Sequence, residues 1–345
     1  MDEYDKLQIQ QLVDQVNSAD IRHSKIVDSM KITKRIIGKQ PDVYQNVILN
    51  HSVNVLKTCE NIISNYINDH GDVVTIEELI NVFQFLHNLC VGQKEFSKEM
   101  WLRLETSILK LFNSEKDSKL TNVLSAIVLQ MIKHNCAPLK NTDAMADILK
   151  SMLAALVTDD SSHFPLIVVQ ELIRNQPEFS LNWTYQHLEL QHKLLLLDII
   201  AEQNLKELPK SVVEFLAACF KEQASILMTV MNQKSTTNPC ETIRVLKLIG
   251  TYSHSNEFIH TLQADKSLLI DAVYLLRMVH ESGKSNPDHM FGTVKSITEV
   301  GNTEKMESDP VFGFKRDLIR LIGNLCHEKR ENQDQVLLLY VMNHF

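Results

Sequence analysis

Apolar residues recur with helical spacing along the chain, and the pattern is sharpest between residues 310 and 336. Five of them fall at i, i+4, i+7, i+8 and i+11, on one face of an α-helix: Phe314, Leu318, Leu321, Ile322 and Leu325. A polar run over 327–334 and a second apolar segment over 336–341 follow. Helix, short polar turn and helix form the unit of an α-solenoid.

The same period describes nearly all of the remaining sequence. Two amphipathic stretches, near 21–37 and 43–67, are divided by Pro41, which suits a helix start. Thr75 and Glu78 have the spacing of a capping box. No stretch alternates strictly for long, and no Asn-Gly or Asp-Gly hairpin pair occurs. The pattern predicts an all-α protein of about 14 to 18 helices, an α-solenoid of armadillo/HEAT-like helical repeats in a right-handed superhelix.

Two internal echoes indicate the repeat length. The segment 86–90 parallels 322–326, and 248–250 parallels 321–323. Without the polar insertion described next, the echoes give intervals of about 42–45 residues, as in armadillo and HEAT repeats. Gly250 and Gly323 stand inside predicted helices, where glycine costs roughly 0.5–1 kcal/mol against alanine. We expect the close approach of a neighbouring helix to compensate; a merely tolerated glycine is the alternative.

The distribution of polar residues predicts three parts. Residues 1–281 are expected to form the armadillo-like repeats. Residues 282–309 are polar and hold three of the nine glycines, so they are expected to form a mobile insertion loop. The Ser and Thr residues of this loop could accept regulatory phosphates, or the loop could have no role. Residues 311–345 begin a C-terminal domain.

Charge and hydropathy narrow the class of protein. The net charge is −8, and Lys and Arg are scattered, which disfavours nucleic acid as a partner. The densest basic cluster, over 31–39, shares its helix with isoleucines and is interpreted as a solvated face. No apolar run reaches the ~20 residues of a membrane span. The N-terminus lacks a signal-peptide pattern, and the six dispersed cysteines suit a reducing compartment. We expect a cytoplasmic protein.

The sequence contains no common catalytic or cofactor motif. The patterns GxGxxG, GxxxxGK[ST], HExxH, GxSxG and paired CxxC are absent, and no histidine has metal-ligand spacing to Cys or His. The chain is therefore predicted not to be an enzyme and to have no catalytic, cofactor or metal residues. A helical enzyme or a lipid-binding bundle remains the remote alternative, and it would need a deep pocket.

Two asparagines are candidates for peptide contact. Asn88 and Asn324 occupy equivalent positions in the first echo. In armadillo proteins that hold extended peptides, inner-helix asparagines both donate to and accept from the peptide backbone. The intervening repeats do not supply a continuous ladder, since Thr251 stands at the matching position after Gly250. A structural role, bonding a neighbouring turn, is therefore favoured over a peptide ladder.

The stretch from Pro310 to Asp334, with FGFKRDLIRLIGNLC at its centre, resembles the C-terminal domain of the ataxin-10 family. The helical region upstream, with its Asn88-Leu89-Cys90 repeat end, suits the same family. The resemblance assigns a structural or interaction role to the following residues: Phe312, Gly313, Phe314, Lys315, Leu318, Leu321, Ile322, Gly323, Asn324, Leu325 and Cys326.

The resemblance implies a non-enzymatic scaffold or adaptor. It implies roles in neuron survival and neurite outgrowth, in cytokinesis and in ciliary function. The implied partners are O-linked N-acetylglucosamine transferase, a G-protein β subunit and further copies of the chain. The implied locations are the cytoplasm, including the perinuclear region, the midbody, the centrosome and the cilium base. A peptide-groove armadillo receptor, like a transport adaptor, is the alternative function.

One departure from the family concerns the C-terminus. The family's domain continues through further helices with a motif of the form NPFxxEWA, whereas this sequence ends at Phe345. We therefore expect an incomplete domain, in an isoform, a gene model or a fragment. The segment 336–341 would then lack a covering helix and leave an apolar face exposed.

Overall fold

The computed structural model consists of packed α-helices. It describes residues 3–18, 23–39, 41–69, 74–114, 117–134, 142–158, 163–175, 181–232, 239–285 and 313–342. These contain seventeen α-helices and one 3₁₀ turn, and none of the described residues forms a strand. The predicted all-α, helical-repeat solenoid fold is thereby confirmed. The chain divides into two compact units, residues 1–172 and 173–345.

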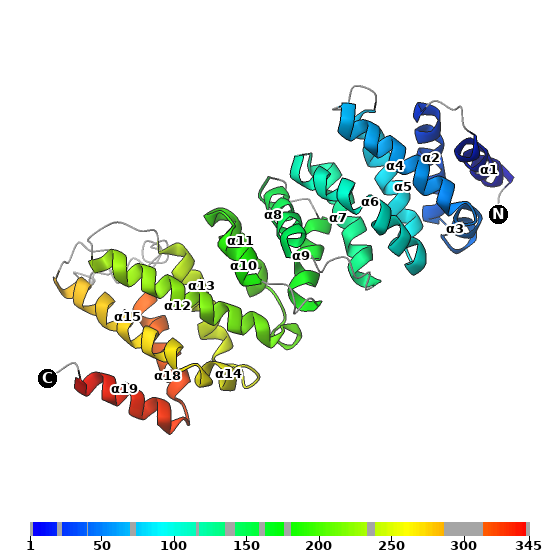
Figure 1. Cartoon of the computed structure of the whole chain (residues 1–345). Coiled ribbons are helices and arrows are strands. Elements are labelled where there is room, and N and C mark those ends of the chain that lie inside the picture. The colour runs from blue at the N-terminus through cyan, green and yellow to red at the C-terminus, as the bar shows by residue number, and fades with distance from the viewer. Residues whose placement is uncertain are drawn as a thin grey trace, which may run out of the picture. The chain divides into compact units, whose positions relative to one another are not determined.

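Unit 1 contains two layers of helices. One layer comprises α2 (His23–Lys39), α5 (Ile76–Cys90) and α7 (Ser118–Lys133), which pack in that order. The other comprises α1 (Glu3–Asn17), α4 (Ser52–Asp69), α6 (Lys94–Ser114) and α8 (Thr142–Thr158), again in order (Figure 1). The short α3 (Pro41–Leu49) precedes α4, and α9 (His163–Asn175) contains the boundary to unit 2.

Unit 2 repeats this arrangement. Its first layer comprises α11 (Leu190–Ala201), α13 (Cys240–Tyr252) and α18 (Phe314–Cys326). Its second comprises α12 (Lys210–Asn232), α15 (Lys266–Ser285) and α19 (Arg330–Met342). Short elements connect them: α10 (Leu181–Gln186), a 3₁₀ turn (Leu205–Glu207) and α14 (Ile259–Ala264). Figure 1 shows α12 and α15 side by side, with α18 next to α15.

Two sets of helices form three-helix repeats. In unit 1 the short α3, the long α4 and then α5 form one repeat, and in unit 2 α14, α15 and α18 form its counterpart. We call α2, α5, α7, α11, α13 and α18 the third helices, since α5 and α18 stand third in these repeats and the others share their layers. α5 ends at Cys90 and α7 at Lys133, 43 residues further on. This spacing matches the sequence-derived repeat of about 42 residues.

Local sequence signals explain several helix ends. The Thr75 hydroxyl accepts from the Glu78 amide at 3.3 Å, and the Glu78 carboxylate accepts from the Thr75 amide at 2.8 Å. This is the predicted capping box, and it satisfies two amides that lack helical partners.

The stretch 43–67 was expected as one helix, but it is divided into α3 and α4 by a turn at Asn50 and His51. Residues 282–285, expected in the polar insertion, form the last turn of α15. The rest of that insertion lies outside the described residues.

The two internal glycines of the third helices do not mark close helix packing. A Cβ built on Gly250 or on Gly323 would meet no atom within 4 Å. The expected close approach of a neighbouring helix is therefore wrong at both positions. Gly313, by contrast, has φ +80° just before α18, and a Cβ there would lie 2.8 Å from the Arg316 guanidinium.

These differences predict opposite effects of alanine at the three glycines. Gly250→Ala and Gly323→Ala should each stabilise unit 2 by about 0.5–1 kcal/mol, because alanine favours the helix and has space there. Gly313→Ala should destabilise it by about 1 kcal/mol, because the left-handed backbone disfavours a side chain. Urea denaturation of the three variants tests this, and destabilisation by Gly323→Ala would contradict the open space beside it.

Candidate interaction surface

A short basic-apolar-apolar-glycine motif recurs on three third helices. It reads Arg35-Ile36-Ile37-Gly38 in α2, Lys247-Leu248-Ile249-Gly250 in α13 and Arg320-Leu321-Ile322-Gly323 in α18. The echo between α13 and α18 was apparent from the sequence, whereas the copy in α2 was missed. The signal that could have found it is the four-residue match itself. In all three copies the basic residue is exposed.

The packing shows that the copies in α2 and α13 occupy equivalent places. α2 packs against α5 as α13 packs against α18. The side chain of Asn88 in α5 lies opposite Gly38, its Nδ2 being 3.9 Å from a Cβ built there. Asn88 and Asn324 thus each stand on the third helix that follows a copy of the motif.

A buried glutamine from the first helix of each repeat binds the end of its third helix. Gln45 Nε2 donates to the carbonyls of Asn88 (2.6 Å) and Val91 (3.0 Å). Gln263 Nε2 donates to the carbonyls of Asn324 (3.2 Å) and His327 (2.9 Å). Each pair of acceptors is three residues apart and lies at the helix end, where carbonyls run short of helical donors; the Asn324 carbonyl also accepts from the His327 amide at 3.2 Å. We call this contact the glutamine clamp.

The carboxamides of the two candidate asparagines bind the preceding third helix. Asn88 Nδ2 donates to the Lys34 carbonyl at 2.9 Å, and Asn324 Nδ2 donates to the Ser253 hydroxyl at 3.0 Å. Both donors therefore hold neighbouring elements of the fold. These hydrogen bonds to a neighbouring helix end agree with the structural role favoured for the two asparagines. Direct peptide contact by Asn88 and Asn324 stays a prediction.

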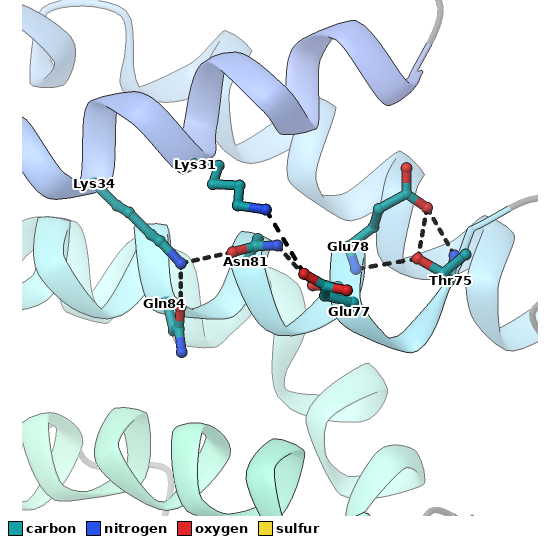
Figure 2. A network of polar contacts seen from close by, with 7 residues as sticks. All are labelled: Lys31, Lys34, Thr75, Glu77, Glu78, Asn81 and Gln84. Atoms are coloured by element: carbon teal, nitrogen blue, oxygen red, sulfur yellow. Dashed lines mark hydrogen bonds and ion pairs between the residues drawn. The ribbon is translucent and has the colours of Figure 1, made fainter.

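In unit 1 the seam between α2 and α5 is bridged by polar side chains (Figure 2). Lys34 Nζ donates to Asn81 Oδ1 at 2.6 Å and also to Gln84 Oε1. Lys31 lies 3.6 Å from the Glu77 carboxylate. Burial lowers the pKa of Lys34, and the nearby positive charges of Arg35 and Lys31 lower it further. The polar groups along this seam bind one another.

His87 is half-buried beside Asn88, and its pKa is lowered. Burial lowers its pKa below 6.5, the Nδ1 contact with Asn88 Oδ1 at 3.3 Å opposes this, and the Lys133 charge adds to it. Its Nε2 is buried without a hydrogen-bond partner among the described residues, and its ring meets Phe164 edge-on with centroids 6.0 Å apart. A proton on Nε2 would have no acceptor there.

This geometry predicts that unit 1 loses stability in mild acid. Below the unfolded histidine pKa of about 6.5 the unfolded chain binds more protons than the folded one, so the free energy of unfolding falls as pH falls toward the lowered pKa. His87→Leu should show a smaller loss between about pH 7 and pH 5, measured by urea denaturation. An equal pH dependence in both chains would contradict the assignment.

In unit 2 a groove of about 760 Å³ lies between the third helices α11 and α13. The α11 side contributes Leu197, Asp198 and Ala201, with Gln203 and Leu205 beyond it. The α13 side contributes the remaining lining residues: Cys240, Ile243, Arg244, Lys247, Leu248, Thr251 and Tyr252. The floor is largely apolar, and the charged groups among these residues are Asp198, Arg244 and Lys247.

The polar groups of the groove differ in how they are engaged. Arg244 and Asp198 form an ion pair between the two helices, with 41% and 48% of their side chains exposed. The Tyr252 hydroxyl donates to the Ile200 carbonyl at 3.2 Å, and burial raises its pKa to about 12. Lys247 is exposed and forms no ion pair with any described residue. The groove therefore combines an apolar floor with one ion pair and one cation that has no acidic partner among the described residues.

No described helix combines the length and the apolar character that crossing a membrane requires. Nowhere in the described part of the chain do three or more His, Cys, Asp or Glu side chains gather as metal ligands would.

Comparison with known proteins gives relatives that are named ataxin-10. No protein-family model matches the chain. Ataxin-10 of Macaca fascicularis is 24% identical over 277 residues, which cover 75% of this chain and 56% of the relative. The ataxin-10 proteins of Bos taurus and Homo sapiens are 24% and 23% identical and cover 73% and 75% of it. This chain is related to ataxin-10. It spans about half the length of the curated relatives it matches, 54–56%.

The residues that first suggested ataxin-10 divide into a buried and an accessible set. Phe314, Leu318, Leu321 and Leu325 are at most 1% exposed and form the core-facing stripe of α18. The members that are exposed or half-buried are Gly313, Lys315, Ile322, Gly323, Asn324 and Cys326. Phe312 lies outside the described residues. Their interaction role stays a prediction.

The final helix carries the apolar face that the sequence led us to expect. Leu337, Leu338, Tyr340 and Val341 of α19 are between 43% and 64% exposed, whereas Leu339 is 9% exposed. α19 packs against α15 and α18 through its other side.

Proposed function

We propose that this chain is a non-enzymatic scaffold that binds other proteins through the third-helix layer of unit 2. The proposal depends on one observation, the groove between α11 and α13 with exposed Lys247 beside it. Helical-repeat proteins use the surfaces of successive equivalent helices to bind partners. The relationship to ataxin-10 supports a role that depends on binding and not on catalysis.

Catalysis in this groove is disfavoured by the engagement of its reactive groups. Asp198 is paired with Arg244, and the Tyr252 hydroxyl donates to a backbone carbonyl. Neither group is therefore held ready to remove a proton or attack a substrate. We accordingly propose that the chain is not an enzyme and place the helical enzyme and the lipid-binding bundle behind the scaffold.

The partners and cellular roles are extensions of the proposal. By resemblance to ataxin-10, the partners are O-linked N-acetylglucosamine transferase, a G-protein β subunit and further copies of this chain. The same resemblance gives a cytoplasmic location that includes the perinuclear region, midbody, centrosome and cilium base. It gives roles in neuron survival and neurite outgrowth, cytokinesis and ciliary function.

Direct binding of purified proteins tests the scaffold proposal. The chain should bind the transferase or the G-protein β subunit with a Kd of about 1 μM or tighter, measured by biolayer interferometry. Size-exclusion chromatography with light scattering tests self-association on the same samples. Failure of both proteins to bind at concentrations well above that Kd would overturn this choice of partners.

A further inference from the structure

The third-helix surface of unit 2 carries cations in excess of anions. Arg244 and Lys247 of α13 and Arg316 and Arg320 of α18 are half-exposed or exposed. The acids beside them are already engaged, since Asp198 pairs with Arg244 and the buried Asp317 lies 3.2 Å from Arg316. Among the described residues, neither Lys247 nor Arg320 forms an ion pair. This surface is basic although the chain carries a net charge of −8.

Lys247 and Arg320 occupy the same position of the repeated motif on adjacent helices. α13 and α18 pack against each other, and packed helix axes lie about 8–10 Å apart. The two cations therefore lie on neighbouring helices of the layer, about one helix spacing apart. The α11–α13 groove continues the surface on the other side of α13, and Lys247 also lines it. Cations and groove thus form one continuous surface, which we call the basic strip.

The shape and charge of the basic strip define the chemistry of its ligand. We infer that the basic strip binds an extended acidic segment of a partner protein. An extended chain rises about 3.3 Å per residue, so carboxylates three residues apart span the spacing of adjacent helices. An apolar side chain between or beside the carboxylates enters the groove over Leu197, Ala201 and Ile243. The inference rests on the proposed function and specifies its partner class.

The groove already shows how a carboxylate is bound. Asp198 presents its carboxylate to Arg244 across the two helices. Both side chains are about half exposed, and such ion pairs contribute little to stability because water screens them. A partner carboxylate can therefore replace Asp198 on Arg244 at little cost, or bind Lys247 while the pair persists.

A protein segment fits the basic strip better than a nucleic acid. Tyr252, the aromatic residue that lines the groove, is 2% exposed and cannot offer a face for base stacking. The net charge of −8 opposes the approach of a polyanion. An acidic protein segment does not need an aromatic face for stacking. Its carboxylates are widely spaced, so the net negative charge of the chain opposes it less than it opposes a nucleic acid.

The test uses labelled probe peptides and the full chain. The acidic probe has Glu at every third position with Leu between, and the matched probes replace Glu by Gln or by Lys. Fluorescence anisotropy should show binding of the acidic probe only, weakening as salt is added. The double variant Lys247→Glu/Arg320→Glu should bind at least about tenfold more weakly. Both side chains are exposed, so circular dichroism and the thermal midpoint should be unchanged.

A matched variant controls for net charge. Lys110→Glu/Lys150→Glu makes the same charge change on exposed residues of α6 and α8 in unit 1, and it should bind the acidic probe like the unchanged chain. Equal binding by the two double variants, or no binding of the acidic probe to the unchanged chain, overturns the inference. So does tighter binding of single-stranded oligonucleotides or phosphatidylserine vesicles than of the probe.

The same proteins separate this inference from the proposed function. If the transferase or the G-protein β subunit binds the unchanged chain and Lys247→Glu/Arg320→Glu equally well, the scaffold stands and the basic strip is not its binding surface. If neither partner protein nor the acidic probe binds, the choice of partners and the inference about the basic strip both fail.

Discussion

Leu321→Asp is expected to unfold the C-terminal helices of unit 2. Leu321 is fully buried in α18, which packs against α13, α14, α15 and α19. An unpaired carboxylate there loses its hydration and leaves the leucine's contacts unmade, at a cost of about 4 kcal/mol or more. Hydrogen exchange measured by mass spectrometry should show lost protection in peptides from α13 to α19, while peptides from unit 1 keep theirs.

Ile319→Asp provides the matched control on the same helix. Ile319 is two residues away but 59% exposed, so the same carboxylate stays hydrated. The expected change in the free energy of unfolding is within about 0.5 kcal/mol. Unchanged protection of α18 in Leu321→Asp, or equal losses in both variants, would refute the placement of Leu321 in the core.

Loss of either glutamine clamp should destabilise its own repeat by about 2–3 kcal/mol. Gln263→Leu keeps the side-chain size but removes the amide donor from the carbonyls of Asn324 and His327, of which, among the described residues, only Asn324 keeps a second donor, the His327 amide at 3.2 Å. Gln45→Leu does the same to Asn88 and Val91 in unit 1. Because the two contacts are equivalent, we expect similar costs, measured by hydrogen exchange at the ends of α18 and α5 respectively.

Gln333→Leu controls for the effect of burial on this contact. Its amide also donates to a helix-end carbonyl, that of Cys326 at 2.9 Å, but the side chain is exposed. Water can replace that donor, so the expected cost is below about 1 kcal/mol. If Gln263→Leu cost no more than Gln333→Leu, the clamp would not stabilise the repeat.

Much of the fold could be predicted because its signals are local. The capping box at Thr75 and Glu78 involves residues three apart, and the stripe of α18 reflects the helical period alone. The short α14 was not predicted, because six residues with two buried side chains, Leu262 and Gln263, give little periodic signal. Its existence depends on its packing against α12, α15 and α18.

The candidate surface was harder to predict because it depends on tertiary contacts. Gln45 and Gln263 look like ordinary polar residues in the sequence, and only the fold brings them to helix ends more than 40 residues away. The prediction for the glycines of α13 and α18 was wrong because a glycine inside a helix indicates only a reduced helix propensity. It does not indicate whether a neighbouring helix packs against that position. The groove could not be predicted either. The sequence places Asp198 and Arg244 on different helices, and no local pattern connects them.

The two kinds of side-chain bond at the helix ends have separate consequences for cooperativity. The glutamine clamp joins the first and third helices of one repeat, whereas Asn88 and Asn324 bind the third helix before their own. In a one-dimensional, Ising-like description, the clamp contributes to the intrinsic energy of a repeat and the asparagine to the coupling between neighbours. Substitutions at the asparagines would therefore broaden the unfolding transition of a unit, while substitutions at the glutamines would shift its midpoint.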